Sequence, residues 1–273
     1  MTGDIDEAID WQGRQVDCGP CTHRGVNEGG RCALKHACVR DRYARRIDRF
    51  FTWNPELSNA YLDHPHFEVR AIAAKFADLV LLPPLLADPD ETVRWNAVCR
   101  LPRRYLLLLR EDPHREVRIR VASLLEVGDL VSMMRDEDYY VRLTVARRVG
   151  ADLLPAMMAD DEPEVRRVVA SRIGGGALHR MASDEDREVR LAAVRRLEPK
   201  DLGGFHRDLD WRVRYEAACR ASPGLLREMI NDPDELVREF VLQRLEQVEA
   251  QKATNVVRLD PRTSRQTPRE PLR

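Results

Sequence analysis

The stretch Asp88-Pro-Asp-Glu-Thr-Val93-Arg94-Trp-Asn-Ala97-Val98-Cys-Arg-Leu101 contains the pattern that decides the fold. Its Val-Arg pair returns every 24 residues without an insertion. The eight copies are Val69-Arg70, Val93-Arg94, Val117-Arg118, Val141-Arg142, Val165-Arg166, Val189-Arg190, Val213-Arg214 and Val237-Arg238. A fixed period of this length is the signature of a repeat array, in which each unit packs against its neighbours.

The first half of each unit has the pattern of an amphipathic helix. With the Val of Val-Arg as position zero, apolar residues recur at positions four, five and eight, as at Ala97, Val98 and Leu101. These positions share one helix face with position zero. An Asp stands five residues before zero in seven units, and a pair such as Asp88-Pro89 predicts an N-cap and a first turn. We therefore expect an α-helix of about three turns in each unit.

The second half of each unit is short, with about ten residues left for it and both connections. Seven units carry a Leu thirteen residues after zero, and another apolar residue follows three positions later, as at Leu82 and Leu85. An apolar spacing of three in so short a segment favours a 3₁₀ helix. The pattern predicts an all-α solenoid of eight 24-residue units that alternate α and 3₁₀ helices.

Composition narrows the possible functions. The 273 residues include 45 basic and 46 acidic side chains, for a formal net charge of −1, which argues against a general polyanion-binding protein. The longest apolar stretch, from Leu79 to Ala87, contains two prolines and is too short to span a bilayer. We expect a soluble cytoplasmic protein without a membrane segment.

Four cysteines precede the array and form the candidate cofactor and metal site. They are separated by two, ten and five residues, and the longest loop contains Gly25, Gly29 and Gly30, which let backbone approach a cluster closely. Cysteines of a cytoplasmic protein stay reduced, so metal binding is favoured over disulfides. The spacing alone suits a zinc ion or a [4Fe-4S] cluster equally. The ligand candidates are Cys18, Cys21, Cys32 and Cys38.

Other residues near the cysteines have simpler interpretations. His23 and His36 are expected beside the site rather than in it, because four thiolates complete the coordination. Apolar residues recur at helical spacing between positions 38 and 53, and we expect this helix to dock on the first repeat. Residues 250–273 are rich in Arg, Pro, Thr and Gln and predict a disordered tail. The predicted domains are 1–54 for the cysteine domain, 55–249 for the solenoid and 250–273 for the tail.

Two ladders of arginines run through the array. The Arg of Val-Arg lies within the apolar stripe, so we expect it to bind the Asp six residues earlier, in its own or the neighbouring unit. A second arginine lies seven residues after zero in six units, as at Arg100. We expect this ladder to be solvated and paired with nearby acids, and the alternative is a basic strip for an acidic partner or a phosphate backbone.

The repeat and the cysteines together resemble the leucine-rich repeat variant family. Its units have the form Asp-Pro-x-x-x-Val-Arg-x-x-Ala-Ala-x-x-Leu, as from Asp88 to Leu101, and the likeness covers residues from about 15 to 248. The resemblance implies a right-handed superhelix of α and 3₁₀ helices with an N-terminal [4Fe-4S] domain, ligated by the four cysteines. It also implies a nitrogen-fixation context, whereas zinc is the alternative cofactor.

No enzyme motif accompanies this arrangement. The sequence contains neither a phosphate-binding Walker loop nor a dinucleotide fingerprint, and the run Gly174-Gly175-Gly176 lies where a connection is expected. We expect a non-enzymatic iron–sulfur protein whose repeats bind a protein partner and whose cluster is redox-active or redox-sensing. The alternatives are a structural cluster or zinc on a pure interaction scaffold, and a nucleic-acid-binding protein similar to HEAT-repeat proteins.

Overall fold

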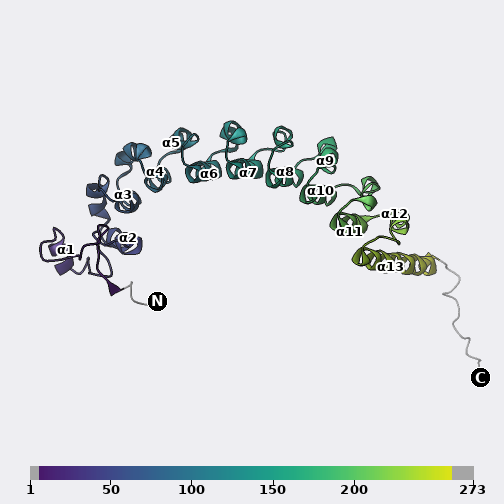
Figure 1. Ribbon diagram of the computed structural model, residues 1–273, viewed down its shortest axis with the longest axis horizontal. Helices are drawn as coiled ribbons and strands as arrows, with labels where there is room; N and C mark the ends of the chain where they lie inside the picture. Colours follow the sequence, from purple (N-terminus) through teal and green to yellow (C-terminus); the bar gives the residue numbers. More distant parts are fainter. Residues whose placement is uncertain (1–5, 260–273) are drawn as a thin grey trace, which may run out of the picture. The chain divides into compact units, whose positions relative to one another are not determined.

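The computed structural model describes residues 6–259, and its regular elements in that range are helices (Figure 1). The described residues contain no β-strand, only the isolated antiparallel bridges of Ile9 with Gln15 and of Ala33 with Ala37. The expectation of an all-α protein is confirmed over this range. The chain forms two compact units, Met1–Val145 and Ala146–Arg273.

A long helix begins in every repeat two residues before the Val of Val-Arg. This constant offset arises because the apolar stripe that follows the Val recurs at the same positions in each repeat. These helices are α3 (Phe67–Ala73), α4 (Glu91–Val98), α6 (Arg115–Leu124), α7 (Tyr139–Arg148), α8 (Pro163–Ala170), α10 (Arg187–Val194), α11 (Trp211–Arg220) and α13 (Glu235–Leu259).

A second row of shorter helices completes the repeats within each unit (Figure 1). Most are 3₁₀ helices as predicted, but α5, α9 and α12 are α-helical. In α12 the reason is local, because the Ser222 hydroxyl accepts the Leu225 N–H and Pro223 occupies the first turn. The row contains η3 (Leu79–Leu81), η4 (Pro83–Ala87), α5 (Arg103–Leu106), η5 (Leu107–Leu109), η6 (Val127–Asp129), η7 (Val131–Arg135), η8 (Leu154–Met157), α9 (Gly175–Met181), η9 (Pro199–Asp201), η10 (Phe205–Arg207) and α12 (Pro223–Glu228).

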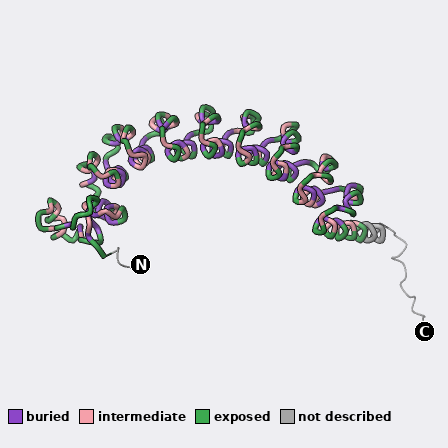
Figure 2. The backbone as a smooth tube through the Cα atoms, in the orientation of Figure 1, coloured by how far each residue is buried: buried purple, intermediate pink, exposed green. Residues whose placement is uncertain are grey.

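The apolar core of each repeat lies between its long helix and its shorter helices. All eight Val residues at position zero are at most 1 % exposed. The Leu residues of the shorter row, such as Leu82, Leu130 and Leu202, are also fully buried. Figure 2 shows this buried backbone concentrated in the long helices. The predicted apolar stripe therefore forms the packed face.

The N-cap lies two residues later than predicted, as helix α4 shows. Asp88 was expected to be an N-cap, but its carboxylate accepts the N–H of Asp90 and binds an arginine of the preceding repeat. Asp90 is the N-cap of α4, and its Oδ1 accepts the Thr92 N–H at 2.9 Å. The Asp-Pro pair therefore forms the turn before the helix, because its carboxylate is already engaged between repeats.

The Val-Arg arginines connect successive repeats. Arg94 donates from Nε and Nη2 to both carboxylate oxygens of Asp112 in the next repeat, each at 2.7 Å. Its Nη1 donates to the carbonyl oxygen of Asp88 in its own repeat at 2.8 Å. The predicted Arg–Asp ladder is thus present, with the carboxylate supplied by the neighbouring repeat. The same two-oxygen pairing is made by Arg70–Asp88, Arg118–Asp136, Arg166–Asp184, Arg190–Asp208 and Arg214–Asp232, among others.

The second arginine ladder does not form the expected strip paired with acids. Arg100 donates to the carbonyl oxygens of Ala74 and Ala77, which follow helix α3 of the preceding repeat. Arg172 donates in the same way to the carbonyls of Ala146 and Val149. Cations at the C-terminal end of a helix satisfy its free carbonyls and its dipole. These guanidinium groups therefore bind the helix ends of the preceding repeat.

The N-terminal segment packs on the first repeat as predicted. It contains α1 (Arg24–Glu28), α2 (Ala44–Trp53) and η2 (Pro55–Tyr61). Phe50 and Phe51 of α2 are fully buried in one apolar cluster with Val69 of α3. The Phe51 ring also stacks on Phe76 at 6.3 Å. Helix α2 therefore covers the apolar end of the array, which would otherwise be exposed to water.

The C-terminal prediction needs a correction. Helix α13 runs to Leu259, so residues 250–259 of the expected disordered tail are helical, while residues 260–273 lie outside the described range. Leu, Glu, Gln, Ala and Lys after Arg244 are good helix formers and continue the helix beyond the repeat pattern. No helix among the described residues combines the length and apolarity needed to cross a membrane.

Candidate metal centre

Cys18 and Cys21 lie on one tight turn at the start of the N-terminal segment. The Cys21 N–H donates to the Cys18 carbonyl at 3.4 Å, and the Arg24 N–H donates to the Cys21 carbonyl at 3.1 Å. The Gly19 N–H is held by the carboxylate of Asp17 at 2.8 Å. This turn leads directly into α1, so both cysteines are presented from a short, hydrogen-bonded segment.

Cys32 and Cys38 flank a small hairpin, which explains why they lie together. Ala33 and Ala37 exchange both backbone hydrogen bonds, at 2.9 and 2.8 Å. Residues that flank such a pair also face each other across the two segments. The turn requires Lys35 to adopt a φ of 62°, a left-handed conformation that is unfavourable for a residue with a Cβ atom. Both cysteines are buried, whereas Cys18 and Cys21 are partly exposed.

The four thiols influence one another electrostatically. The hydrogen bond with Cys38, followed by burial, raises the pKa of Cys32, and the same bond lowers the pKa of Cys38 to about 7. Burial, with the charges of Cys38 and Cys21, raises the pKa of Cys18. Four neighbouring thiolates therefore need a cationic centre to coexist, because each charge opposes the ionisation of the next.

This donor set fits the cofactors that the sequence predicts. Four soft sulfur donors are the ligands of an iron–sulfur cluster, and also of a four-thiolate zinc ion. The Asp41 N–H donates to the Cys38 carbonyl oxygen at 3.3 Å, and backbone hydrogen bonding from Arg40 and Asp41 contributes to the lowered pKa of Cys38. Within residues 6–259, no three His, Cys, Asp or Glu side chains already have the arrangement of a metal site.

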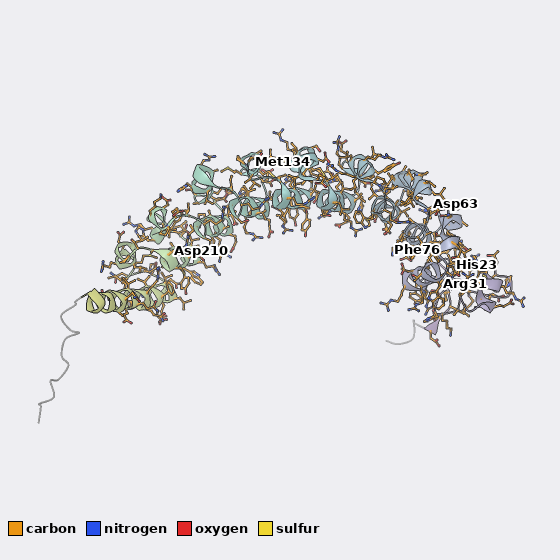
Figure 3. The ribbon with its side chains drawn as sticks, turned by 180° about the vertical axis from the view of Figure 1, so that it is seen from behind. His23, Arg31, Asp63, Phe76, Met134 and Asp210 are labelled. Carbon is orange, nitrogen blue, oxygen red and sulfur yellow. The ribbon has the colours of Figure 1, made fainter. Side chains whose placement is uncertain are left out.

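Tyr61 and His23 form a hydrogen-bonded pair beside the cysteines. The Tyr61 hydroxyl contacts His23 Nε2, and the His23 ring lies 5.1 Å from that of Phe50. Burial, followed by the charges of Cys21 and Cys38, raises the pKa of Tyr61 to about 12. His23 and Arg31 both lie in this N-terminal region (Figure 3). His23 is thus placed beside the thiols, as expected, through a tyrosine from the adjoining η2.

His36 and Arg40 have surroundings different from those of His23. His36 is exposed and lies against Arg49, which donates to its carbonyl oxygen at 2.9 Å. Arg40 donates to the carbonyl oxygen of Asp17 at 3.2 Å and favours the ionised form of Cys18. Sequence reasoning missed the roles of Arg40 and Tyr61, because neither follows a motif spacing. The basic run from residue 40 to residue 49 was the available signal for the arginine.

A separate cavity of about 580 Å³ lies in the second unit, along helices α10, α11 and α13. Trp211, Tyr215, Phe240 and Leu236 supply an apolar lining, and the Tyr215 and Phe240 rings are 4.5 Å apart. The ion pair between Arg195 and Glu216, at 3.1 Å, borders this lining. Aromatic residues with a charged rim are typical of protein-binding surfaces.

Comparison with known proteins places these features in one family. A solved structure, a leucine-rich repeat variant with a novel repetitive protein structural motif, is 41 % identical and superposes with a TM-score of 0.81. The match covers 84 % of this chain and 99 % of that one. The chain belongs to the leucine-rich repeat variant family. Residues 8–60 additionally match the family model described as "LRV protein FeS4 cluster".

A curated relative of this leucine-rich repeat variant protein comes from Rhodobacter capsulatus. It is an uncharacterized 27.7 kDa protein in the nifB 3′ region, 50 % identical over 96 residues. The aligned part is 35 % of this chain and 39 % of that relative, so the match spans about two fifths of the relative's length. The resemblance inferred from the repeats and cysteines is therefore confirmed.

Proposed function

We propose that Cys18, Cys21, Cys32 and Cys38 bind a [4Fe-4S] cluster and that the repeats are a non-enzymatic scaffold for a protein partner. The observation that carries the proposal is the placement of four cysteines in one short segment that docks on the first repeat, two of them on a tight turn and two flanking a hairpin. The description of the family model for residues 8–60 supports iron–sulfur over zinc. When bound, such a cluster supplies one-electron transfer, so it is redox-active or redox-sensing.

Residues of this chain would control the environment of the cluster. Backbone hydrogen bonding from Arg40 and Asp41 helps to lower the pKa of Cys38, which favours the thiolate. The Arg40 guanidinium adds a positive charge near Cys18. Burial of Cys32 and Cys38 limits access of water on one side of the site.

The repeat array supports the scaffold part of the proposal. Both arginine ladders bind groups of the protein itself, so nucleic-acid binding on a basic strip is less favoured than protein binding. The aromatic cavity near Tyr215 provides a surface suited to a partner. We include in the proposal an eight-repeat, right-handed solenoid, a cytoplasmic location and a role in nitrogen fixation, the last suggested by the relative in the nifB region.

Anaerobic purification with assays for iron, acid-labile sulfide and zinc tests the cofactor. We expect brown protein with about four irons and four sulfides per chain. Colourless protein with about one zinc per chain would show that the four cysteines bind a structural zinc ion instead of a cluster. Cys21→Ala should lose the colour, whereas Cys99→Ala, which changes an exposed cysteine at the C-cap of α4, should keep it.

A redox titration of the holo protein then separates the two roles of a cluster. A reversible one-electron couple within the cellular range supports redox activity. A cluster that accepts no electron in that range would act only as a structural cap of the repeats.

A further inference from the structure

A basic hollow lies on the surface of the N-terminal segment, over the hairpin between Cys32 and Cys38. It has a volume of about 360 Å³ and combines the hairpin turn with the first half of α2. The residues that line it are Lys35, Tyr43, Arg45, Arg46 and Arg49. Four of these five side chains are cationic, so the hollow has a strongly positive potential.

The cations of the hollow are only partly neutralised by the protein. Arg46 is buried and bound to Asp41 at 2.8 Å, and Lys35 forms an exposed ion pair with Asp6 at 3.2 Å. Arg45 and Arg49 have no carboxylate within ion-pair distance in the described part of the chain. They lie one helical turn apart, where two like charges destabilise a helix. An anion in the hollow would relieve this repulsion.

Two side chains of the hollow are held in place by the backbone around them. Arg49 Nη1 donates to the His36 carbonyl oxygen and contacts His36 Nδ1, both at 2.9 Å. Lys35 occupies the left-handed position of the turn, where glycine would be less strained. An unfavourable backbone conformation with a charged side chain is a feature that often marks a binding site.

Two exposed apolar residues adjoin residues that line the hollow and are called its rim: Leu34 precedes Lys35 in the chain, and Trp53 follows Arg49 by one helical turn on α2. Leu34 on the hairpin is 39 % exposed, and Trp53 at the end of α2 is 37 % exposed, with its ring 5.5 Å from that of His36. A large aromatic residue next to unpaired cations is the composition of a protein-binding centre rather than of a surface that only stays hydrated. Free phosphate would use the cations but not this rim.

We propose that the hollow and its rim dock an acidic protein surface, whose carboxylates bind Arg45, Arg49 and Lys35. This docking site rests on the proposed function in one respect. A partner docked there covers the hairpin between Cys32 and Cys38, which are two of the proposed cluster ligands. The charge pattern favours carboxylates of a folded partner over nucleic acid, because the cations occupy one hollow instead of a line along a duplex.

The test uses the full-length holo protein and poly-L-glutamate of about 50 residues as a probe for an acidic surface, at low and moderate salt. We expect salt-sensitive binding that the double variant Arg45→Gln/Arg49→Gln weakens at least about tenfold. The matched control is Arg24→Gln/Arg31→Gln, which removes the same charge from exposed arginines already paired with Glu28 and Glu56. The control should change binding less than about twofold.

Cross-linking locates the contact independently. Carbodiimide joins carboxylates to amines, and the chain has only four lysines, at positions 35, 75, 200 and 252. We expect the probe to be joined to Lys35, with Lys75 as the internal comparison because it is similarly exposed and ion-paired but does not line the hollow. Trp53→Ala should weaken binding without a change in net charge.

Each other outcome overturns the proposal. Equal loss of binding in both double variants would show a non-specific charge effect, and absence of binding would exclude the site. A 24-base-pair duplex that binds more tightly and depends on the same arginines would indicate nucleic acid. Inorganic phosphate that displaces the probe from a saturable single site would indicate a small anion. Iron content, measured on the same samples, decides the cluster assignment separately from docking.

Discussion

The repeat array and the N-terminal segment treat their polar groups in opposite ways. In the array, each buried arginine finds a carboxylate in the next repeat, as Arg94 does with Asp112. In the N-terminal segment, four thiols have Arg40 as a nearby positive charge, and Arg45 and Arg49 have no carboxylate within ion-pair distance among residues 6–259. A buried or clustered charge without a partner is unfavourable. The array therefore neutralises its buried charges with its own side chains. The N-terminal segment needs a cofactor, and by our proposal a partner, to neutralise its charged groups.

The largest expected effect is loss of the cofactor from the holo protein. Because ligand binding contributes directly to the stability of a small metal domain, removal should destabilise residues 6–54 selectively. Hydrogen exchange measured by mass spectrometry should increase by about a hundredfold or more there, with little change in α10 and α11. Equal loosening of the N-terminal segment and of these repeats would contradict the difference between the two regions.

Breaking one rung of the Arg–Asp ladder should be the next largest effect. Asp112→Ala leaves the buried guanidinium of Arg94 without its carboxylate, for which we expect a loss of about 3–5 kcal/mol in unfolding free energy. Glu111→Ala is the matched control, since the Glu111 side chain is 82 % exposed, and should change stability by less than about 0.5 kcal/mol. Urea denaturation measures both.

A double variant sharpens this prediction. Arg94→Met/Asp112→Leu removes both charges, so no buried ion is left unpaired. We expect it to be more stable than Asp112→Ala, although it lacks the same hydrogen bonds. A double variant as unstable as the sum of the two single changes would mean that Arg94 and Asp112 stabilise the protein independently, without energetic coupling across the rung.

The fold was predictable because the same pattern of apolar and charged residues occurs eight times in the sequence. The buried position of Val93 and the Arg94 partner type both follow from helical periodicity and from the need to pair a buried charge. The choice between the two available aspartates did not follow, because Asp88 and Asp112 are equivalent in sequence. Only the packing of successive repeats decides that the carboxylate comes from the following one.

The candidate site was predictable at its ligands and not around them. Cys18, Cys21, Cys32 and Cys38 have an informative spacing, whereas Tyr61 reaches the thiols from the next element. The second arginine ladder was misjudged for a related reason. Helical position gave the edge of the apolar stripe for Arg100, but its partners are carbonyls of the preceding repeat, and carbonyl groups leave no mark in the sequence.

Removing a rung of this second ladder should have an intermediate effect. Arg100→Met keeps the apolar part of the side chain and loses the hydrogen bonds to the Ala74 and Ala77 carbonyls. We expect a loss of about 1–2 kcal/mol, measured by urea denaturation. The reciprocal change is Leu124→Arg, because Leu124 occupies the equivalent position and is 47 % exposed. If neither variant changed the unfolding free energy, the second-ladder arginines would not stabilise the helix ends and would act only as surface charges.

The smallest expected effect comes from adding an N-cap to α6, a repeat helix that lacks an Asp cap. Five repeat helices have an Asp N-cap whose side chain accepts backbone N–H groups, whereas α6 begins with His114, which makes no such bond. The buried Nδ1 of His114 also has no hydrogen-bond partner among the described residues. His114→Asp should therefore raise the unfolding free energy by about 0.5–1 kcal/mol, because it adds a cap and removes an unsatisfied nitrogen. His114→Asn, a cap of similar strength without charge, is the control for repulsion from Glu91 and Asp112. A gain with Asn but not with Asp would show that local charge limits this position, and no gain with either would show that α6 is fixed by repeat packing alone.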